Sequence, residues 1–486
     1  MIHDPGNKFG RYGTGRRPLS HLAFQTASAE GAWALTDIEG RIPRDLKGAL
    51  YRIAPGQKEN HGIPLRHFFD GDAFLSSFTF QQGRLHLQAR FVDTPQRLEE
   101  MMTGRMLYPE FGTQPPPPPL GWKPEPGGKN QPSINVILWD NRLLGLSEGG
   151  HPAAIDPEDL SYQGRWDFYG TLPGDVPFTA HPKFDPQTGE GYAFGVKRGP
   201  GFDLTVFRME ANGTLTQIYA LPQEGYFMIH DMMLAGEHLV FVIPPVRLDL
   251  EALFSGRVSI AEALRYDENE PTRFLILHRD GKGLPVTIEQ PANMVFHHGN
   301  AFEREGKIVV DSILSPDNAV LELLNAWSLD ERPKASPPQL TRLVLDPVNA
   351  RVESRTVLNI AQEFPRFDIR RNGEDLRYLY TLESGIPEDP FTSTALVRHD
   401  LHRGTIQRIE ADPGRALGEA VFGPHPGRKE EDRGWLLMQG YDAIRDESYL
   451  ELRDAGALEF VARVWTGQHF PLGFHGNFYP TPSAGQ

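Results

Sequence analysis

Four histidines in this chain of 486 residues share one local format that favours metal binding. Each follows an apolar or aromatic run and precedes a small, turn-forming or polar residue, as is seen around His181, His230, His297 and His475. An imidazole at the end of a buried strand is unfavourable unless its nitrogens find partners. A single histidine of this kind is most simply a hydrogen-bonded core residue. Four of them with one format favour a shared metal ion.

Three glutamates are candidates to support these imidazoles. A metal-bound imidazole normally gives its other N–H to a carboxylate or a carbonyl, which fixes the tautomer. Each glutamate lies among apolar or small residues, where an unpartnered carboxylate would be costly to bury. They are Glu148, Glu363 and Glu419. Each one alone is equally well explained as a turn or surface residue, but three carboxylates and four imidazoles could satisfy one another.

The composition limits the chemistry that the chain can use. The sequence has no cysteine, so thiolate ligands, thiol nucleophiles and disulfides are excluded. Imidazole and carboxylate ligands suit iron, copper, zinc or manganese. The sequence contains no P-loop, no dinucleotide-binding glycine loop and no Gly-x-Ser-x-Gly elbow. The net charge is −15 without a basic block, so we expect no nucleic-acid partner.

The elements that must position these side chains are short β-strands. From residue 50 onwards, alternating or apolar runs are separated by Gly, Asn or Asp turns, and Gly (49) and Pro (42) are both abundant. The pattern continues without a break in composition, which favours one all-β domain over residues 1–486, either a propeller or a sandwich. The histidine spacings are compatible with propeller blades of about 70 residues whose ligands meet on a central axis.

Helical signals are few, and the clearest lies between two of the histidine segments. Residues 250–266 contain Ser259 and Glu262 at capping-box spacing, and Gly256 should divide the stretch into two short helices. We expect an insertion at about residues 247–267 over one face of the sheets. The proline run at 115–119 should be an extended strap. It is either a plain linker or, with the helices, an apolar lip around a substrate entrance.

The sequence gives an expectation for location as well. The first eight residues lack the apolar region of a signal peptide, and no apolar run approaches 18 residues. We therefore expect a cytoplasmic protein without a membrane span. Amphipathic signals in the insertion suggest the further hypothesis of an apolar patch that docks peripherally on membranes to extract a lipid-dissolved substrate.

Taken in order, the histidine and glutamate segments resemble those of the carotenoid cleavage oxygenase family, which also contains stilbene- and isoeugenol-cleaving enzymes. The resemblance runs from residues 42–52 and 69–72 to residues 471–477 and covers nearly the whole chain. It implies a seven-bladed β-propeller, with loops and short helices over one face, whose axis holds a non-haem Fe(II). The family pattern selects His297 over His298, which should point to the other face of its strand. The implied iron ligands are His181, His230, His297 and His475, steadied by Glu148, Glu363 and Glu419.

The resemblance also implies a reaction. Members of the family cleave a C=C bond with O2 into two carbonyl products and use no organic cofactor. Activating O2 is the task of the metal, while the protein supplies position and a dry tunnel, so no catalytic side chain is expected beyond the iron centre. The expected partners are an apolar alkene and O2. Tunnel positions of the family fall on Phe69, Met228, Phe296 and Phe364, which could equally be ordinary core residues.

Two further positions bear on the substrate. Stilbene-cleaving members typically place a Lys just before the first glutamate to hold a phenolic oxygen, and Ser147 stands there in this chain. The threonine often found near the iron is replaced by Ile134. We therefore expect cleavage of a carotenoid or apocarotenoid, with a stilbene or phenylpropenoid alkene of the isoeugenol type as the alternative. An alternative from another functional class is a non-catalytic propeller that binds lipid or partner proteins and needs no stoichiometric iron.

Overall fold

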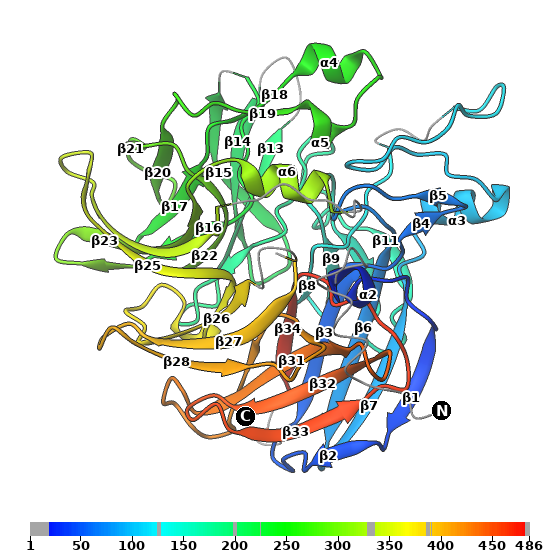
Figure 1. Ribbon diagram of the computed structural model, residues 1–486. Coiled ribbons are helices and arrows are strands. Elements are labelled where there is room, and N and C mark those ends of the chain that lie inside the picture. The colour runs from blue at the N-terminus through cyan, green and yellow to red at the C-terminus, as the bar shows by residue number, and fades with distance from the viewer. Residues whose placement is uncertain are drawn as a thin grey trace.

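The computed structural model describes residues 19–123, 128–197, 202–223, 225–327, 336–384, 389 and 391–481. The N-terminal residues considered above for a signal peptide lie outside this set. The described chain is built almost entirely from antiparallel β-strands, which confirms the all-β prediction. Figure 1 shows the sheets arranged around a common centre. This propeller-like arrangement decides against the sandwich alternative.

Four of the sheets are separate antiparallel units. The first contains β1 (Gly31–Leu35), β3 (Gly48–Pro55), β6 (Ala73–Gln81), β7 (Arg84–Phe91) and β34 (Gly476–Pro480). The second contains β8 (Asn135–Trp139), β9 (Arg142–Leu146), β10 (Ala153–Ile155) and β11 (Tyr162–Arg165). The third contains β12 (Lys183–Phe184), β13 (Gly191–Lys197), β14 (Phe202–Met209) and β15 (Leu215–Gln223). The fourth contains β16 (Met232–Ala235), β17 (His238–Ile243), β20 (Thr272–His278) and β21 (Val286–Gln290).

The remaining large sheet is continuous because one long strand joins neighbouring units. β25 (Arg351–Arg366) pairs with β24 through residues 351–361 and with β26 through residues 362–366. The other strands on one side of it are β22 (Met294–Arg304), β23 (Lys307–Ser315) and β24 (Gln339–Asp346). Those on the other side are β26 (Tyr378–Ser384), β27 (Ser393–Asp400), β28 (Thr405–Glu410), β29 (Arg415–Leu417), β30 (Val421–Pro424), β31 (Gly434–Asp442), β32 (Glu447–Asp454), β33 (Phe460–Trp465) and β2 (Ile38–Gly40).

The two ends of the described chain meet in one sheet. β34, near the C-terminus, pairs antiparallel with β3, with Gly476 opposite Arg52 and Pro480 opposite Gly48. Figure 1 shows this red strand beside the blue N-terminal strands. Phe478 of β34 is 4% exposed and packs in the same core cluster as the N-terminal strands. The pairing closes the ring and holds the residues before β34 at its centre.

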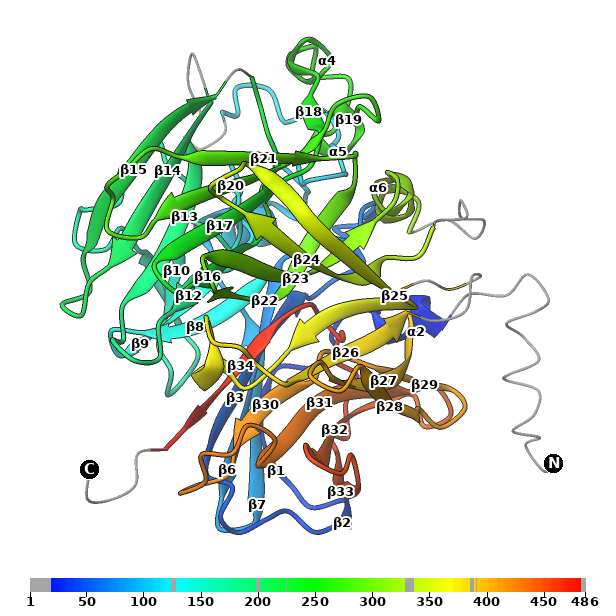
Figure 2. The ribbon, with the colours of Figure 1, turned by 90° about the vertical axis from the view of Figure 1, so that its left-hand side faces the viewer.

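Short α-helices and loops lie over one face of the ring (Figure 2), whereas the 3-10 turn η1 lies by a cavity on the other. Figure 2 shows α2, α4, α5 and α6 on the right-hand side, with β8, β12 and the end of β34 on the left. None of the helices in the described part of the chain is long and apolar enough to cross a membrane. The helices are α2 (Leu19–Ala23), α3 (Pro95–Thr103), α4 (Leu250–Phe254), α5 (Ile260–Ala263), α6 (Ala319–Asn325) and the 3-10 turn η1 (Ile369–Arg371).

The insertion at 247–267 was predicted correctly in part. Gly256, at φ +69°, separates α4 from α5, and the Ser259–Glu262 capping box is formed. The prediction that the helix continues to Tyr266 is wrong, since residues 264–266 form β19 and pair with β18 (Val246–Leu248). The helix ends at Ala263 because Leu264 has extended backbone angles. From Leu264 onwards the chain forms hydrogen bonds with β18 instead of continuing the helix.

Sequence reasoning also missed α3, whose signals are present in the chain. Thr94 caps the helix by accepting the N–H of Arg97, Pro95 begins it, and Gly104 ends it at φ +63°. The proline strap that follows lies against this helix. Arg105 donates to the carbonyl of Pro117, and the ring of Trp122 donates to Glu99 over 2.7 Å. The small ribbon β4 (Glu59–Asn60) with β5 (Ile63–Pro64) lies beside them (Figure 1).

Candidate metal centre

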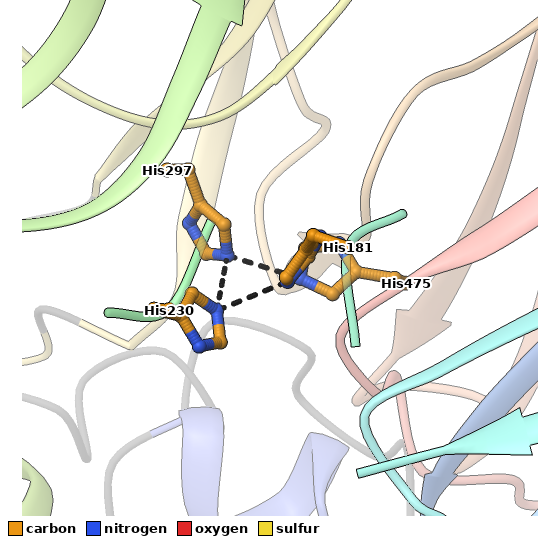
Figure 3. Close-up of side chains that lie close together, drawn as sticks. All are labelled: His181, His230, His297 and His475. Carbon is orange, nitrogen blue, oxygen red and sulfur yellow. Dashed lines mark hydrogen bonds between the residues drawn. The ribbon is translucent and has the colours of Figure 1, made fainter. Parts of the chain in front are cut away.

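The four predicted histidines come together at the centre of the ring, and each arrives from a different sheet. His181 precedes β12, His230 precedes β16, His297 lies in β22 and His475 immediately precedes β34. Figure 3 shows their rings converging with nitrogen atoms turned inward. His181, His230 and His475 lie in loops just before a strand, as the local format suggested. No turn follows His297: the Gly-Asn pair expected to form one lies within β22, whose register shifts on both sides of His298.

The converging atoms are the Nε2 nitrogens. Nε2 of His230 lies 3.1 Å from that of His181 and 3.2 Å from that of His297. Nε2 of His297 lies 3.0 Å from that of His475. One nitrogen from each of the four rings lies within 4.8 Å of the others, a spacing that suits a single metal ion. His298, by contrast, bonds through Nδ1 to Ser312 on β23, as expected for a residue outside the cluster.

Each predicted glutamate contacts the outer nitrogen of one histidine. Glu363 accepts from Nδ1 of His297 over 2.6 Å, and Glu419 accepts from Nδ1 of His475 over 2.8 Å. The Glu148 carboxylate lies against Nδ1 of His230. The sequence placed these carboxylates near the histidines as a set, and the structure gives each its own imidazole.

These contacts provide a test of whether the site fits a metal ion. When Nδ1 carries the proton that a glutamate accepts, Nε2 of the same neutral ring is a lone-pair acceptor. The Nε2 atoms of His230, His297 and His475 therefore face one another as acceptors, and acceptors cannot hydrogen-bond to each other. A cation between them removes this conflict. The donor set consequently fits a non-haem metal held by side chains alone.

Electrostatics within the buried cluster favour the neutral form of His181 and His475, whereas His297 is affected in the opposite direction. Burial, followed by repulsion from the other three rings, lowers the pKa of His181 well below its ordinary value. Burial also lowers the pKa of His475 to about 4, against the opposing effect of Glu419. For His297 burial lowers the pKa, but Glu363 outweighs it and raises the pKa overall.

Glu419 differs from the other two acids because two arginines hold it, Arg52 buried and Arg366 half-buried. Nη1 of Arg52 and Nη1 of Arg366 each lie 3.4 Å from a Glu419 oxygen. Burial opposes the charge of Glu419, but Arg366, His475 and Arg52 outweigh it and lower the pKa of Glu419 to about 2. Arg52 also donates to the carbonyl of Leu472 over 3.0 Å, so the arginines fix the turn that carries His475.

Sequence reasoning missed both arginines as parts of the site. The signal available for Arg366 was its place three residues after Glu363 in Glu-Phe-Pro-Arg. Arg52 stands in a strand that is otherwise apolar, from Leu50 to Ala54. A buried arginine requires an acidic partner, but the sequence does not say which of the many acids provides it.

The four apolar positions expected around a substrate lie together beside the rings. Phe69, Phe296 and Phe364 belong to one aromatic cluster with Phe474, and Met228 packs with Phe296 in the adjoining cluster. The Phe296 ring lies 5.3 Å from that of His230, and the Phe364 ring lies 5.5 Å from that of His297. These packed apolar side chains, which contact residues of α6, are called the upper compartment here.

Phe364 adopts an unusual backbone conformation to reach this place. Its φ is +53°, in the left-handed region that a bulky side chain rarely adopts. The carboxylate of Glu363 accepts the Phe364 N–H over 2.7 Å, and the β25–β26 register shifts between Glu363 and Arg366. The bulge thus turns Phe364 toward His297 and His475, and local strain of this kind concentrates at functional sites.

The remaining two predicted positions have other neighbours. The Ser147 hydroxyl bonds to the side chain of Asn130 and accepts the N–H of Gly149. Ser147 is therefore held by its own loop and provides no cation for a phenolate. Ile134 packs against the core cluster that contains Phe178 and Ala180, on the segment that leads to His181.

Comparison with known proteins bears on what this centre is. The family model described as RPE65, retinal pigment epithelial membrane protein, matches residues 24–480. The chain belongs to this family. The RPE65 family is the one that the histidine and glutamate motifs resembled, and the prediction of an alkene-cleaving oxygenase is confirmed at this level.

Individual members of the RPE65 family match the chain over nearly its full length. The apocarotenoid-15,15'-oxygenase of Synechocystis sp. is 32% identical over 474 residues, covering 94% of this chain and 95% of that protein. Resveratrol cleavage oxygenase 1 of Aspergillus fumigatus is 28% identical, covering 89% and 90%. The crystal structure of cobalt-substituted Synechocystis ACO matches with a TM-score of 0.88 at 31% identity, covering 95% of this chain and 98% of that one.

Proposed function

We propose that the protein is an Fe(II)-dependent dioxygenase that cleaves a C=C bond of a carotenoid or apocarotenoid with O2 to give two carbonyl products. The observation that carries the proposal is the convergence of four imidazole Nε2 atoms, three of them on rings whose Nδ1 contacts a glutamate. The ligands in this proposal are His181, His230, His297 and His475. Family membership favours this enzyme over the non-catalytic binding propeller.

The side chains around the centre have defined tasks in this proposal. The glutamates orient the rings and fix their tautomers, so that Nε2 remains available. When bound, the iron activates O2, and both oxygen atoms enter the two carbonyl products without an external reductant. Phe69, Phe296 and Phe364 exclude water and hold the alkene beside the centre. No side chain is needed as a general acid or base.

The upper compartment supports an apolar polyene as the substrate. Its side chains are aromatic rings and Met228, which offer contact area without hydrogen-bond donors. A 4-hydroxystilbene would need a partner for its phenolic oxygen, and Ser147 is already bonded to Asn130. The sequence relatives nevertheless include a resveratrol-cleaving enzyme. Stilbenes and isoeugenol-type alkenes are therefore the alternative substrates.

The experiment that tests the substrate is product analysis over a panel of alkenes. Ferrous-loaded protein is incubated with apocarotenals of several lengths, 4-hydroxystilbenes and isoeugenol under 18O2, and the products are identified by mass. The proposal predicts two carbonyl products from an apocarotenal, each with one labelled oxygen. Cleavage of hydroxystilbenes or isoeugenol but not of apocarotenals would favour the alternative. No cleavage of any alkene by iron-replete protein would contradict the proposal.

We also propose that residues 1–486 form one domain with seven blades. The four separate sheets account for four of them. The large sheet would divide into three, with β25 shared where the first passes into the second. The separate chain segments that carry the four histidines fit ligands drawn from several blades around one axis.

A peripheral membrane contact is proposed for the capped face. Large apolar side chains are exposed to water after the strap and on helices α3 and α4. Apolar surface exposed in this way often marks a site of interaction with a membrane or another protein. An apolar patch beside the upper compartment would let a lipid-dissolved polyene pass from a bilayer without crossing water. The exposed residues are Leu98, Met101, Met102, Leu120 and Phe254.

A further inference from the structure

The imidazoles lie between two groups of residues on the chain segments that carry them. Residues one or two positions before three of the histidines pack in the upper compartment and are Met228, Phe296 and Phe474. Residues one or two positions after three of the histidines line a second space together with apolar side chains, and are Lys183, Asp231 and Asn477. The layer of rings therefore has two sides, an apolar one and one where charged and apolar side chains are mixed, and the function proposed above uses only the first.

The second side contains a cavity of about 380 Å³, here called the axial cavity. It lies among β8, β12 and β34, on the opposite side of the molecule from α2 and α6 (Figure 2). At its outer end the side chain of Ile369 is 53% exposed, and the rings of Trp139 and Phe184 lie 5.4 Å apart. Its inner end is formed by His181, His297 and His475.

Charged side chains in the axial cavity are paired with opposite charges, which argues against an anionic ligand. Nζ of Lys183 lies 2.7 Å from Asp231, and Arg366 holds Glu419 over 3.4 Å. Arg370 is paired with Asp368 over 2.6 Å. The side chain of Asn372 donates to the carbonyl of Phe184 over 2.8 Å. A cavity whose charges are already compensated suits water or a small neutral molecule.

The proposed reaction requires such a second access. Its two substrates must reach the rings together, and an alkene that fills the upper compartment closes that side to O2. O2 is uncharged and far smaller than the cavity, whose volume corresponds to roughly a dozen water molecules. Phe364 lines the axial cavity and also packs in the upper compartment, so it stands in the wall between the two spaces.

We propose that the axial cavity is the entry and holding site for O2, separate from the compartment that takes the alkene. This inference rests on the proposed function, because it assigns a place to the second substrate of that reaction. O2 enters past Ile369 and Phe184 and meets the imidazole layer from the side opposite the alkene. The site has no role in holding the alkene itself.

The kinetic test measures the KM for O2 in variants whose larger side chains narrow the outer end of the cavity. Ile369→Trp and, as a second variant, Pro186→Trp add bulk at positions that are exposed, so neither crowds the core. The matched control is Ile406→Trp, at a residue that is 48% exposed on β28 and away from the cavity. We expect KM for O2 to rise by about threefold or more in the cavity variants. The KM for the alkene and kcat at saturating O2 should stay as in the wild type.

A second readout does not depend on turnover. Crystals of the wild type pressurised with xenon should show xenon in the axial cavity, because xenon occupies the spaces that O2 can enter. In the Ile369→Trp, Pro186→Trp double variant this xenon should be reduced or lost. Absence of xenon from the wild-type cavity would overturn the inference. Because this measurement needs no alkene, it remains decisive even if the wild type cleaves no alkene and the proposed function fails.

Two kinetic outcomes would also overturn the proposal that O2 enters through the axial cavity. The first is an unchanged KM for O2 in variants that unfold at the same temperature as Ile406→Trp. The second is a raised KM for the alkene with an unchanged KM for O2, which would make the cavity part of the alkene path. Cleavage by the wild type together with either outcome would leave the proposed function in place and remove the inference alone.

Discussion

At the scale of single residues, the metal centre depends as much on the outer nitrogen of each ring as on the inner one. Glu363 and Glu419 accept from Nδ1 of His297 and His475, and this choice of tautomer is what leaves Nε2 free. Loss of one carboxylate should weaken metal binding without removing any ligand.

Glu363→Gln tests this dependence on the carboxylate. The amide keeps the size of the side chain but loses the charge that favours the His297 tautomer, so metal affinity and turnover should each fall by about 10–100-fold. The affinity is measured by competition for Co(II) with a chelator, which reports binding apart from activity. The matched variant is Glu383→Gln, on the neighbouring strand, where the acid pairs with Arg408 instead. Equal affinities in the two variants would show that Glu363 does not steady the ligand.

A buried histidine outside the centre should make stability depend on pH. Burial lowers the pKa of His399 to about 4, and Nδ1 of this ring has no hydrogen-bond partner. The unfolded chain takes up a proton near its ordinary pKa of about 6.5, whereas the folded protein does not. Stability from this residue is therefore complete above pH ~6.5 and is lost as the pH falls toward about 4.

His399→Leu should remove that part of the acid destabilisation, which amounts to up to about 3 kcal/mol. The midpoint of thermal unfolding is measured for both proteins between about pH 7 and about pH 4. The difference between them should shift in favour of the variant as the pH falls. A difference that stays constant over this range would mean that His399 takes up its proton in the folded state.

At this scale, the sequence predicts residues whose signal lies in neighbouring positions and misses those whose role depends on distant strands. The histidines were predictable because the apolar run, the imidazole and the small or polar residue after it are adjacent in sequence and recur, although the turn expected after His297 is not formed. Arg52 and Arg366 were not predictable, since the need to pair them with Glu419 arises only when strands far apart meet. The axial cavity was equally hidden, because its walls come from β8, β12, β22, β25 and β34.

At the scale of elements, backbone pairing decides where sequence signals are overridden. The capping box at Ser259 formed as predicted, but residues 264–266 joined β18 as a strand. β25 belongs to two sheet units at once because its 16 residues continue past a bulge. The local alternation of apolar and polar residues predicted that strands exist. The number of strands in each sheet depends on pairing between strands, which that alternation does not show.

The cap elements carry a testable prediction about membranes. Met102 on α3 is 87% exposed and Phe254 on α4 is 82% exposed. The Met102→Ser, Phe254→Ser double variant should bind liposomes more weakly than the wild type in a flotation assay, because it removes apolar area from the docking surface. Val348→Ser is the matched control, at a residue that is also 87% exposed but lies in the β24–β25 turn. Failure of the wild type itself to float would end the membrane proposal.

At the scale of the whole molecule, ring closure links stability to the metal centre. β34 joins the N-terminal strands through β3, and His475 is the residue immediately before β34. Phe478 anchors that strand in the core formed by Phe78, Phe80 and their neighbours. Weakening this β3–β34 pairing, the seam of the ring, should therefore lower the stability of the fold and disturb the position of His475.

Phe478→Ala should lower the free energy of unfolding by about 3–5 kcal/mol, since it removes a buried aromatic ring. It should also weaken metal binding, because the turn with His475 loses its anchor. Phe460→Ala serves as the control, as Phe460 on β33 is 42% exposed and should lose far less stability. Thermal unfolding and metal content are measured on both variants. Equal losses in the two would argue that the seam has no special role.

The most direct test of the central claim is the iron content of protein loaded anaerobically with Fe(II). The wild type should hold about one iron per chain, and His297→Ala should lose most of it together with alkene cleavage. His298→Ala is the control, since this neighbouring ring bonds to Ser312 instead of facing the centre. Its iron content should equal that of the wild type. Full iron content or retained cleavage in His297→Ala would contradict a centre built from the four converging imidazoles.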